Sequence, residues 1–206
     1  MQIRGLSSNG GNLVDVDTEN QLKVSVGEPV SPTVGGFYTV AGQTSAVVAA
    51  SLGANSSIVT MRMAVNSIRK AYITRFRFVI APATVGTSAL VPGTLGLQRF
   101  SMATPTGGTA RVPNRLDQGY GSGSDITDIR DSNAALTVTN VVFGTVISSS
   151  IVPLFISGGT SAYEWIIEPP CPIVLNPTDG LAVRTQVACP ATQTWMYSYT
   201  VHWYEK

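Results

Sequence analysis

The segment "TWMYSYTVHWYE", just before the C-terminal lysine, constrains the fold more than any other part of the chain. Five large residues recur there at every second position, and they are Trp195, Tyr197, Tyr199, Val201 and Trp203. Period two is the repeat of a β-strand, whose successive side chains point to opposite faces. The segment therefore predicts a strand with one fully buried face, which requires a second layer of structure to cover it.

Eight further strand-like runs are separated by Gly, Pro and Asn turn signals, and they span residues 37–41, 57–65, 72–80, 95–102, 136–140, 144–149, 163–168 and 181–187. About nine short strands with frequent turns are typical of an antiparallel β-sandwich or barrel. Residues 61–76 also fit helical spacing, but their β-branched and aromatic flanks favour two strands joined at Asn66-Ser67. The sequence therefore predicts an all-β fold.

The opening stretch "GNLVDVDTENQLKVSV" predicts a β-hairpin that is separate from the sandwich. Apolar residues alternate with polar ones on both sides of a short break, at Val14, Val16, Leu22, Val24 and Val26. A Pro- and Gly-rich linker follows, so we expect residues 1–36 to form an arm and residues 37–206 to form the sandwich domain. Because a lone two-stranded ribbon is marginally stable in water, the five apolar residues are candidate contacts for a partner.

Residues 104–133, "TPTGGTARVPNRLDQGYGSGSDITDIRDSN", predict a long loop. Structureless loops of this length are uncommon in compact domains and usually carry function or contact a partner. Tyr120 is the only aromatic residue in the segment. It is therefore a candidate interface residue.

Charge is scarce in this chain, since charged residues make up 12% of it and the formal net charge is +1. A binder of nucleic acid or of a membrane surface would show a basic cluster, so neither partner is expected. Residues Met1–Gly5 do not begin a signal peptide, and no apolar run is long enough to span a bilayer. Without an export signal, Cys171 and Cys189 are expected to be free, buried thiols rather than a disulfide.

Catalysis is not expected. The single histidine, His202, lies on the polar face of the last strand, which excludes a His-based metal site or a cupin-type centre and favours a satisfied surface or interface residue. No G-x-S-x-G motif is present. The carboxylates that could act in catalysis form no defensible pair, and they are Asp117, Asp125, Asp128, Asp131, Glu164 and Glu168. The sequence predicts neither an enzyme nor a cofactor.

Three aspartates, Asp125, Asp128 and Asp131, repeat at every third position. Carboxylates can gather around Ca²⁺, but this spacing does not match the D-x-D-x-D-G calcium loop. Pairing with Arg130 on a short turn or helix is the simpler interpretation, so no metal is expected.

Three arginines, Arg62, Arg75 and Arg77, lie within predicted strands. On an outer face they would be solvated charges. At a subunit interface their planar donors could instead bind carboxylates of a partner. They are therefore possible interface residues.

The order of motifs resembles a known group of proteins. The opening "GNLVDVDTENQLKVSV" resembles the segment GN-x-x-x-VD-x-x-x-x-LKV of structural proteins of tailed bacteriophages. The order that follows is similar to a group of phage virion proteins: "GGFYTVAG", "SLGANSSIVTMRMA", "ITRFRFVIAP", "GGTA", "SDITDIRDSNAALT" and "PIVLNPTDGLAVRTQVACPATQTWMYSYTVHW". The resemblance covers most of the chain. It implies a jelly-roll-like antiparallel sandwich, commonly trimeric, that assembles on a phage particle.

The resemblance implies a non-enzymatic virion protein that is assembled in the host cytoplasm. The leading expectation is an auxiliary capsid protein, a cement or decoration subunit, which binds its own copies as a homotrimer and the major capsid protein of the head shell. Its arm would add strands to the sheet edge of a neighbour. The alternative is a tail, collar or fibre protein that binds host receptors or glycans through residues 104–133.

Overall fold

In the computed structural model, the structure describes residues 15–16, 22–23, 35–48, 52–83, 92–101, 104–117, 123–139, 142–153, 162–189 and 194–206. The chain divides into two compact units, Met1–Thr33 and Val34–Lys206, close to the expected end of the arm at residue 36.

In the first unit, β1 (Asp15–Val16) pairs antiparallel with β2 (Leu22–Lys23), and Val16 lies opposite Leu22. The expected hairpin pairing is therefore present in these residues. The other candidate arm residues, Val14, Val24 and Val26, lie outside the described part of the chain.

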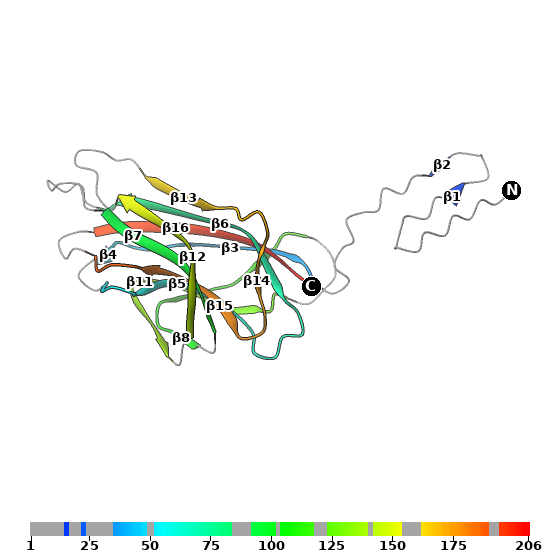
Figure 1. Ribbon diagram of the computed structural model, residues 1–206, viewed down its shortest axis with the longest axis horizontal. Helices are drawn as coiled ribbons and strands as arrows, with labels where there is room; N and C mark the ends of the chain where they lie inside the picture. The colour runs from blue at the N-terminus through cyan, green and yellow to red at the C-terminus, as the bar shows by residue number, and fades with distance from the viewer. Residues whose placement is uncertain are drawn as a thin grey trace. The chain divides into compact units, whose positions relative to one another are not determined.

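The second unit is a sandwich of two antiparallel sheets (Figure 1). Sheet 1 has the strand order β10-β3-β16-β6-β13, with β14 also paired to β6 and β4 to β16. Its strands are β3 (Phe37–Gln43), β4 (Val47–Val48), β6 (Ala71–Pro82), β10 (Asn114–Arg115), β13 (Tyr163–Ile167), β14 (Ile173–Leu175) and β16 (Thr194–Glu205).

Sheet 2 has the strand order β12-β7-β15-β5-β11-β8, with β9 also paired to β11. Its strands are β5 (Ser57–Met63), β7 (Pro92–Ser101), β8 (Thr104–Thr106), β9 (Thr109–Arg111), β11 (Ile126–Thr139), β12 (Val142–Pro153) and β15 (Asp179–Thr185). The described residues of this unit contain no helix. The predicted all-β antiparallel sandwich is confirmed, whereas the jelly-roll arrangement stays a prediction.

The core lies between the sheets and centres on β16, which pairs with β3 on one side and β6 on the other. Its odd-numbered residues point inward, as the alternation predicts, and Trp195 is fully buried. The ring of Phe78 stacks on that of Tyr197 with centroids 4.9 Å apart. Sheet 2 covers this face with aliphatic residues, among them Val59, Met61, Leu97, Leu181 and Val183. Burial of these side chains is the main driving force for folding.

Two further sequence predictions have clear outcomes. Residues 61–76 form the end of β5 and the start of β6, with a turn at residues 65–66, so the two-strand prediction is confirmed. The prediction of a long loop at residues 104–133 is wrong for the described residues, because β8, β9, β10 and the first half of β11 lie within this range.

The loop prediction failed because these strands are short, polar and irregular. The pairing of β11 with β5 shifts register after Ile126 and again after Asp131, which breaks the alternation of side chains. Gly107 and Gly108 interrupt the strands at φ 82° and 62°, where glycine is favoured. A Cβ on Gly108 would lie 2.3 Å from the carbonyl oxygen of Asp131. The two glycines therefore form a kink that lets β8 and β9 both pair with β11.

Candidate functional site

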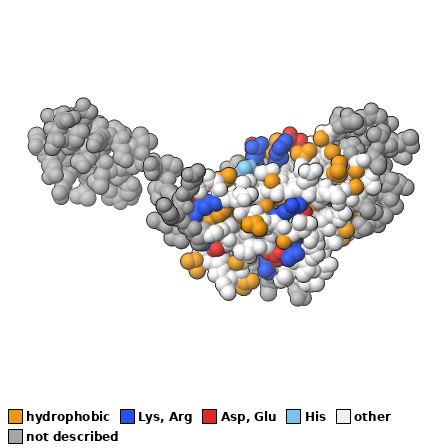
Figure 2. Space-filling model, turned by 180° about the vertical axis from the view of Figure 1, so that it is seen from behind, with side chains coloured by type: hydrophobic (Ala, Val, Ile, Leu, Met, Phe, Trp, Pro, Cys, Tyr) orange, Lys and Arg blue, Asp and Glu red, His pale blue; other side chains and the backbone are white. Residues whose placement is uncertain are grey.

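On strands β16 and β3, the outer face of sheet 1 is built mainly from uncharged side chains. On β16 it consists of the even-numbered residues, all partly exposed, which are Thr194, Met196, Ser198, Thr200, His202 and Tyr204. The neighbouring strand β3 adds Thr39, Ala41 and Gln43. Figure 2 shows the side of the molecule on which the single histidine is exposed, with Lys or Arg side chains (blue) beside it. The β16 and β3 part of this face therefore carries little charge, and the exposed Arg–Glu pairs lie beside it on β6 and on or just after β13.

An aromatic stack lies across three strands of this face. The rings of Tyr72 and Tyr204 are parallel with centroids 4.8 Å apart, and Phe37 lies 5.8 Å from Tyr204. The ammonium group of Lys206 lies 4.8 Å from the Tyr72 ring centroid and 5.8 Å from that of Tyr204. Cation–π attraction and ring stacking hold these side chains in place, so this end of the face is preformed.

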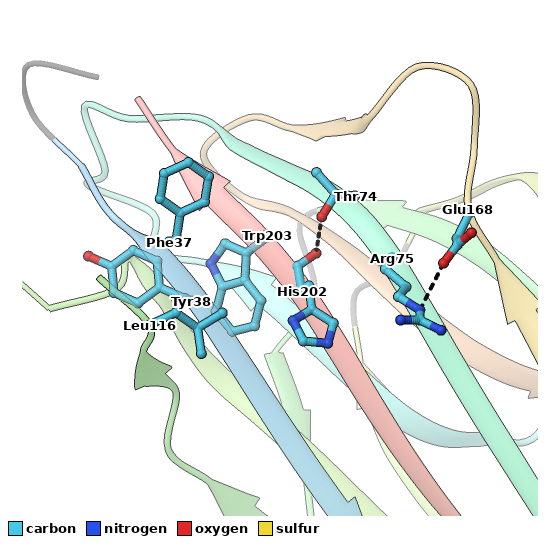
Figure 3. A pocket seen from close by; sticks show the side chains of 8 residues that line it. All are labelled: Phe37, Tyr38, Thr74, Arg75, Leu116, Glu168, His202 and Trp203. Atoms are coloured by element: carbon cyan, nitrogen blue, oxygen red, sulfur yellow. Dashed lines mark hydrogen bonds and ion pairs between the residues drawn. The ribbon is translucent and has the colours of Figure 1, made fainter. Parts of the chain in front are cut away.

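A shallow groove of about 430 Å³ lies beside the stack, lined by Phe37, Tyr38, Thr74, Arg75, Leu116, Glu168, His202 and Trp203 (Figure 3). Tyr38 and Trp203 are both 1% exposed and belong to the core, so the exposed ring of the groove is that of Phe37. The Thr74 hydroxyl donates a hydrogen bond to the carbonyl oxygen of His202 at 3.2 Å. Arg75 and Glu168 form an ion pair, with Nε and Oε1 2.9 Å apart. The groove thus offers aromatic and polar contacts, and its lining brings no nucleophile together with a base.

The candidate interface arginines fall into two places. Arg75 and Arg77 share the outer face of sheet 1, where Arg77 pairs with Glu164. Arg62 lies on sheet 2, with a guanidinium nitrogen 4.0 Å from an Asp128 carboxylate oxygen. Each therefore has a carboxylate partner in its own chain, and the exposed pairs of Arg75 and Arg77 contribute roughly 0–1 kcal/mol each to stability. Tyr120, the fourth candidate, lies outside the described residues.

The three regularly spaced aspartates do not converge. Asp125 accepts a hydrogen bond from the Ser67 hydroxyl at 2.6 Å, and Asp128 accepts one from Nε of Arg130 at 2.8 Å. Asp131 points into the interior and is 1% exposed. The expected Arg130 pairing is present, but on strand β11 rather than on a turn or helix. The aspartates do not converge because an extended chain places residues three positions apart on opposite faces.

Asp131 links the two sheets. It accepts two hydrogen bonds from the guanidinium of Arg111, at 2.6 and 3.1 Å, and a third from the hydroxyl of Tyr199 at 3.0 Å. Arg111 also donates to the carbonyl oxygen of Gln43 at 2.9 Å. Burial, followed by the charge of Asp131, raises the pKa of Tyr199 far above its usual value. The carboxylate is therefore saturated with donors, which suits a structural role.

Glu205 is a second buried carboxylate and is completely inaccessible to solvent. It accepts hydrogen bonds from the backbone N–H groups of Asp125 and Ile126, and from Nε1 of Trp203 at 3.0 Å. The Ser124 hydroxyl donates to it at 2.6 Å, and Arg69 lies 3.2 Å away. Glu205 thus fixes the segment that leads into β11 against the end of β16.

Sequence reasoning missed both buried carboxylates as organising residues, although one signal was present. Glu205 continues the inward-pointing series Trp195 to Trp203, so its position predicts burial and a need for donors. Asp131 has no such signal, because its donors Arg111 and Tyr199 are distant in the sequence.

The remaining candidate carboxylates also pair with arginines. Asp117 accepts a hydrogen bond from Nε of Arg115 at 2.5 Å, and this bond lowers the pKa of Asp117. The described residues contain no cluster of three His, Cys, Asp or Glu side chains able to hold a metal ion. In the same residues, no helix has the length and hydropathy needed to cross a membrane.

Both cysteines are free thiols, as expected. The expectation that both are buried is wrong for Cys171, which is exposed. It lies between Pro170 and Pro172, outside the described strands. Cys189 is partly buried, and burial raises its pKa to about 11.

Comparison of the chain with protein-family models, with curated proteins and with solved structures gave no match.

Proposed function

We propose that this chain is a non-enzymatic structural protein of a tailed-phage virion, and that it serves as an auxiliary capsid subunit of the cement or decoration type. It binds its own copies, as a homotrimer, and the head shell that the major capsid protein forms. The observation that carries the proposal is the strand order of the sandwich. The motif order along the sequence supports it independently.

The strand order supports a jelly roll. Sheet 1 contains the run β3-β16-β6-β13, and sheet 2 contains the run β12-β7-β15-β5. When these eight strands are numbered 1 to 8 in chain order, the order in sheet 1 is 1-8-3-6 and the order in sheet 2 is 5-4-7-2. Two interleaved Greek keys produce this order, and the resulting double sheet recurs in viral capsid proteins, lectins and cupins. Here β11 is an added strand outside β5.

A fold alone does not choose among these functions. A cupin-type centre requires several histidines, and this chain has one. The phage-like order of motifs favours the capsid class over the lectin class. The β16 and β3 part of the outer face of sheet 1 agrees with that choice, because its largely uncharged surface can lie against a neighbouring subunit with little cost of desolvating charge.

The N-terminal unit supplies the means of attachment in this proposal. It forms a compact unit of its own, and it contains the short β1–β2 pairing. Its strands can extend a neighbour's sheet through backbone hydrogen bonds, which is the mode known as β-augmentation. Because many identical arms act together on a symmetric shell, a modest contact for each subunit becomes strong collectively.

The experiment is a binding assay on purified phage heads that lack the subunit. Full-length protein is expected to decorate the heads, and a variant without residues 1–26 is expected to fold and not to bind. Urea denaturation of the truncated variant checks that its sandwich is intact. Equal decoration by both proteins would refute attachment through the arm.

One observation favours a second candidate, a tail or fibre protein that binds glycans. The groove on sheet 1 has an aromatic ring at its rim, since Phe37 is 47% exposed, and it has the polar groups of Arg75, Glu168 and His202 beside it. Its volume is at the lower end of the range for small-ligand sites. Glycan binding that is lost in Phe37→Ala would favour this candidate, and absence of binding to host-surface glycans would remove it.

A further inference from the structure

We infer that the outer edge of β12 is the docking site for the N-terminal arm of a second copy of this chain. The inference rests on the proposed arm function and identifies the edge at which the added strand binds. It follows from a comparison of the sheet edges in the described part of the sandwich.

Strand β12 is long, and in the described part of the chain it pairs on one side only, with β7. It lies within an uncharged stretch of 32 residues, 132–163, in which there is no Asp, Glu, Lys, Arg or His. Natural edge strands are usually protected from pairing with other chains by charges, prolines or short length. The only proline in β12 is Pro153, at its end. The pairing of β12 with β7 also shifts register between Phe143 and Ser148, so the regular part without these protections runs from Ser148 to Val152.

The other described edges are protected. Strand β13 has Glu164 within it and the sequence Glu168-Pro169-Pro170 directly after it. Strand β8 has three residues with Pro105 at its centre, and β10 has two residues. An unprotected β12 beside protected neighbours indicates a strand that is kept available for pairing.

The edge is also held rigidly in place. Phe143 packs against Phe100 with ring centroids 6.1 Å apart, and the guanidinium of Arg184 lies 3.6 Å from the Phe143 ring centroid. Nε2 of Gln98 donates to the carbonyl oxygen of Gly144 at 2.6 Å, which satisfies this oxygen where the strand is irregular. From Ser148 to Pro153 the pairing with β7 is regular. A rigid template lowers the entropy lost when a strand is added.

The arm matches this edge. Strands β1 and β2 pair over two residues each, so the hairpin gains from any further pairing. The alternating segment Leu22 to Val26 has five residues, and the regular part of β12 has six. Eight residues, from Gly27 to Val34, follow this segment and span up to about 26 Å when extended. This length is sufficient for the arm to reach the sandwich of a neighbouring subunit.

The test uses two matched pairs of variants in the full-length chain. Ile147→Lys places a charge on the β12 edge, where Ile147 is 39% exposed. Its control, Ile166→Lys, places the same charge on β13, where Ile166 is 44% exposed. Leu22→Asp combined with Val24→Asp changes the apolar face of the arm, and Ser25→Asp is the control on its polar face. Light scattering across a concentration series gives the dissociation constant, and hydrogen–deuterium exchange follows residues 145–153.

We expect wild-type protein to self-associate with the β12 amides protected. Ile147→Lys and the double arm variant raise the dissociation constant at least about tenfold and lose the same protection, whereas both controls behave as wild type. The inference is overturned if the wild-type chain stays monomeric, or if Ile147→Lys associates normally. It is also overturned if only Ile147→Lys disrupts association, since β12 would then pair with β12 of a second copy.

These outcomes are distinct from a failure of the proposed function. Self-association of the purified chain does not require a particle. Absence of the chain from virions would refute the proposed function and leave the β12 docking result valid. Normal association of Ile147→Lys would refute docking at β12 and leave the proposed function valid.

Discussion

The hydroxyl of Tyr199 on β16 donates a hydrogen bond to Asp131 on β11 at 3.0 Å, and so joins the two sheets through a buried contact. Arg111 adds two hydrogen bonds to the same carboxylate. On this side the sheets are linked by a polar cluster, whereas β12, in the described residues, forms backbone pairs with β7 alone. The sandwich therefore has one closed side and one side suited to assembly.

Replacing Asp131 with alanine should destabilise the sandwich. The change leaves the Tyr199 hydroxyl and the Arg111 guanidinium without their acceptor in a buried site, at a cost of about 3 kcal/mol. Urea denaturation measures this loss. The matched control is Glu164→Ala, which removes an exposed partner of Arg77 and should cost less than about 1 kcal/mol. Equal losses for the two variants would show that the Asp131 cluster contributes nothing special.

Glu205→Gln should loosen the segment that leads into β11. The glutamine amide would present an N–H₂ group to the donors that now surround the carboxylate, including the N–H groups of Asp125 and Ile126. We expect a loss of roughly 2–4 kcal/mol in stability and faster hydrogen exchange at residues 123–126. Lys206→Ala, at the next position, is the control and should leave exchange there unchanged. Unchanged exchange in Glu205→Gln would contradict the assignment.

Alkaline pH should destabilise the protein through two buried tyrosines. Burial raises the pKa of Tyr197 and of Tyr199 well above the usual value of 10.0. Each group keeps its proton more tightly in the folded state, so the stabilisation is fully present below pH 10 and falls as the pH rises further. The expected decline is up to about 1.4 kcal/mol per pH unit for each tyrosine.

Denaturation midpoints at pH 8, 10 and 11 measure this decline. In Tyr199→Phe, which has a lower stability at neutral pH, the slope above pH 10 should be smaller than that of the wild type but not zero, because the pKa values of Tyr197, Tyr38 and Cys189 are also raised in the folded state. A flat profile up to pH 11 in the wild type would contradict this prediction.

The two thiols should differ in reactivity. Cys171 is exposed, whereas Cys189 is partly buried with its pKa raised to about 11, and the thiolate is the reactive form. At pH 8 a thiol reagent should label Cys171 first, with Cys189 slower by at least about tenfold. Mass spectrometry of digested, labelled protein separates the two sites. Cys171→Ser should remove the fast phase, and equal labelling rates would argue against burial of Cys189.

Much of the fold was predictable because it depends on alternation. The inward-pointing series on β16 runs unbroken from Trp195 to Trp203, and it predicts both the strand and the need for a covering layer. Strands β5 and β6 were likewise recognisable from their β-branched and aromatic residues. In these elements the local pattern and the tertiary packing agree.

The missed elements depend on partners that the local sequence does not reveal. Strands β8, β9 and β10 are two or three residues long and exist because longer strands, β11 and β3, provide their hydrogen bonds. Register shifts in β11 remove its alternation. The cluster at Asp131 combines side chains that are up to 88 positions apart in sequence, from Arg111 to Tyr199. Such contacts arise from topology rather than from spacing.

A reconstruction of the intact phage particle by electron cryo-microscopy tests the central proposal most directly. The account predicts density for the two-sheet sandwich in symmetric copies on the outside of the head shell, with an N-terminal arm from each copy running to an adjacent subunit. Particles that contain no copy of this chain, or that have its density confined to the tail tip, would contradict the proposed capsid role.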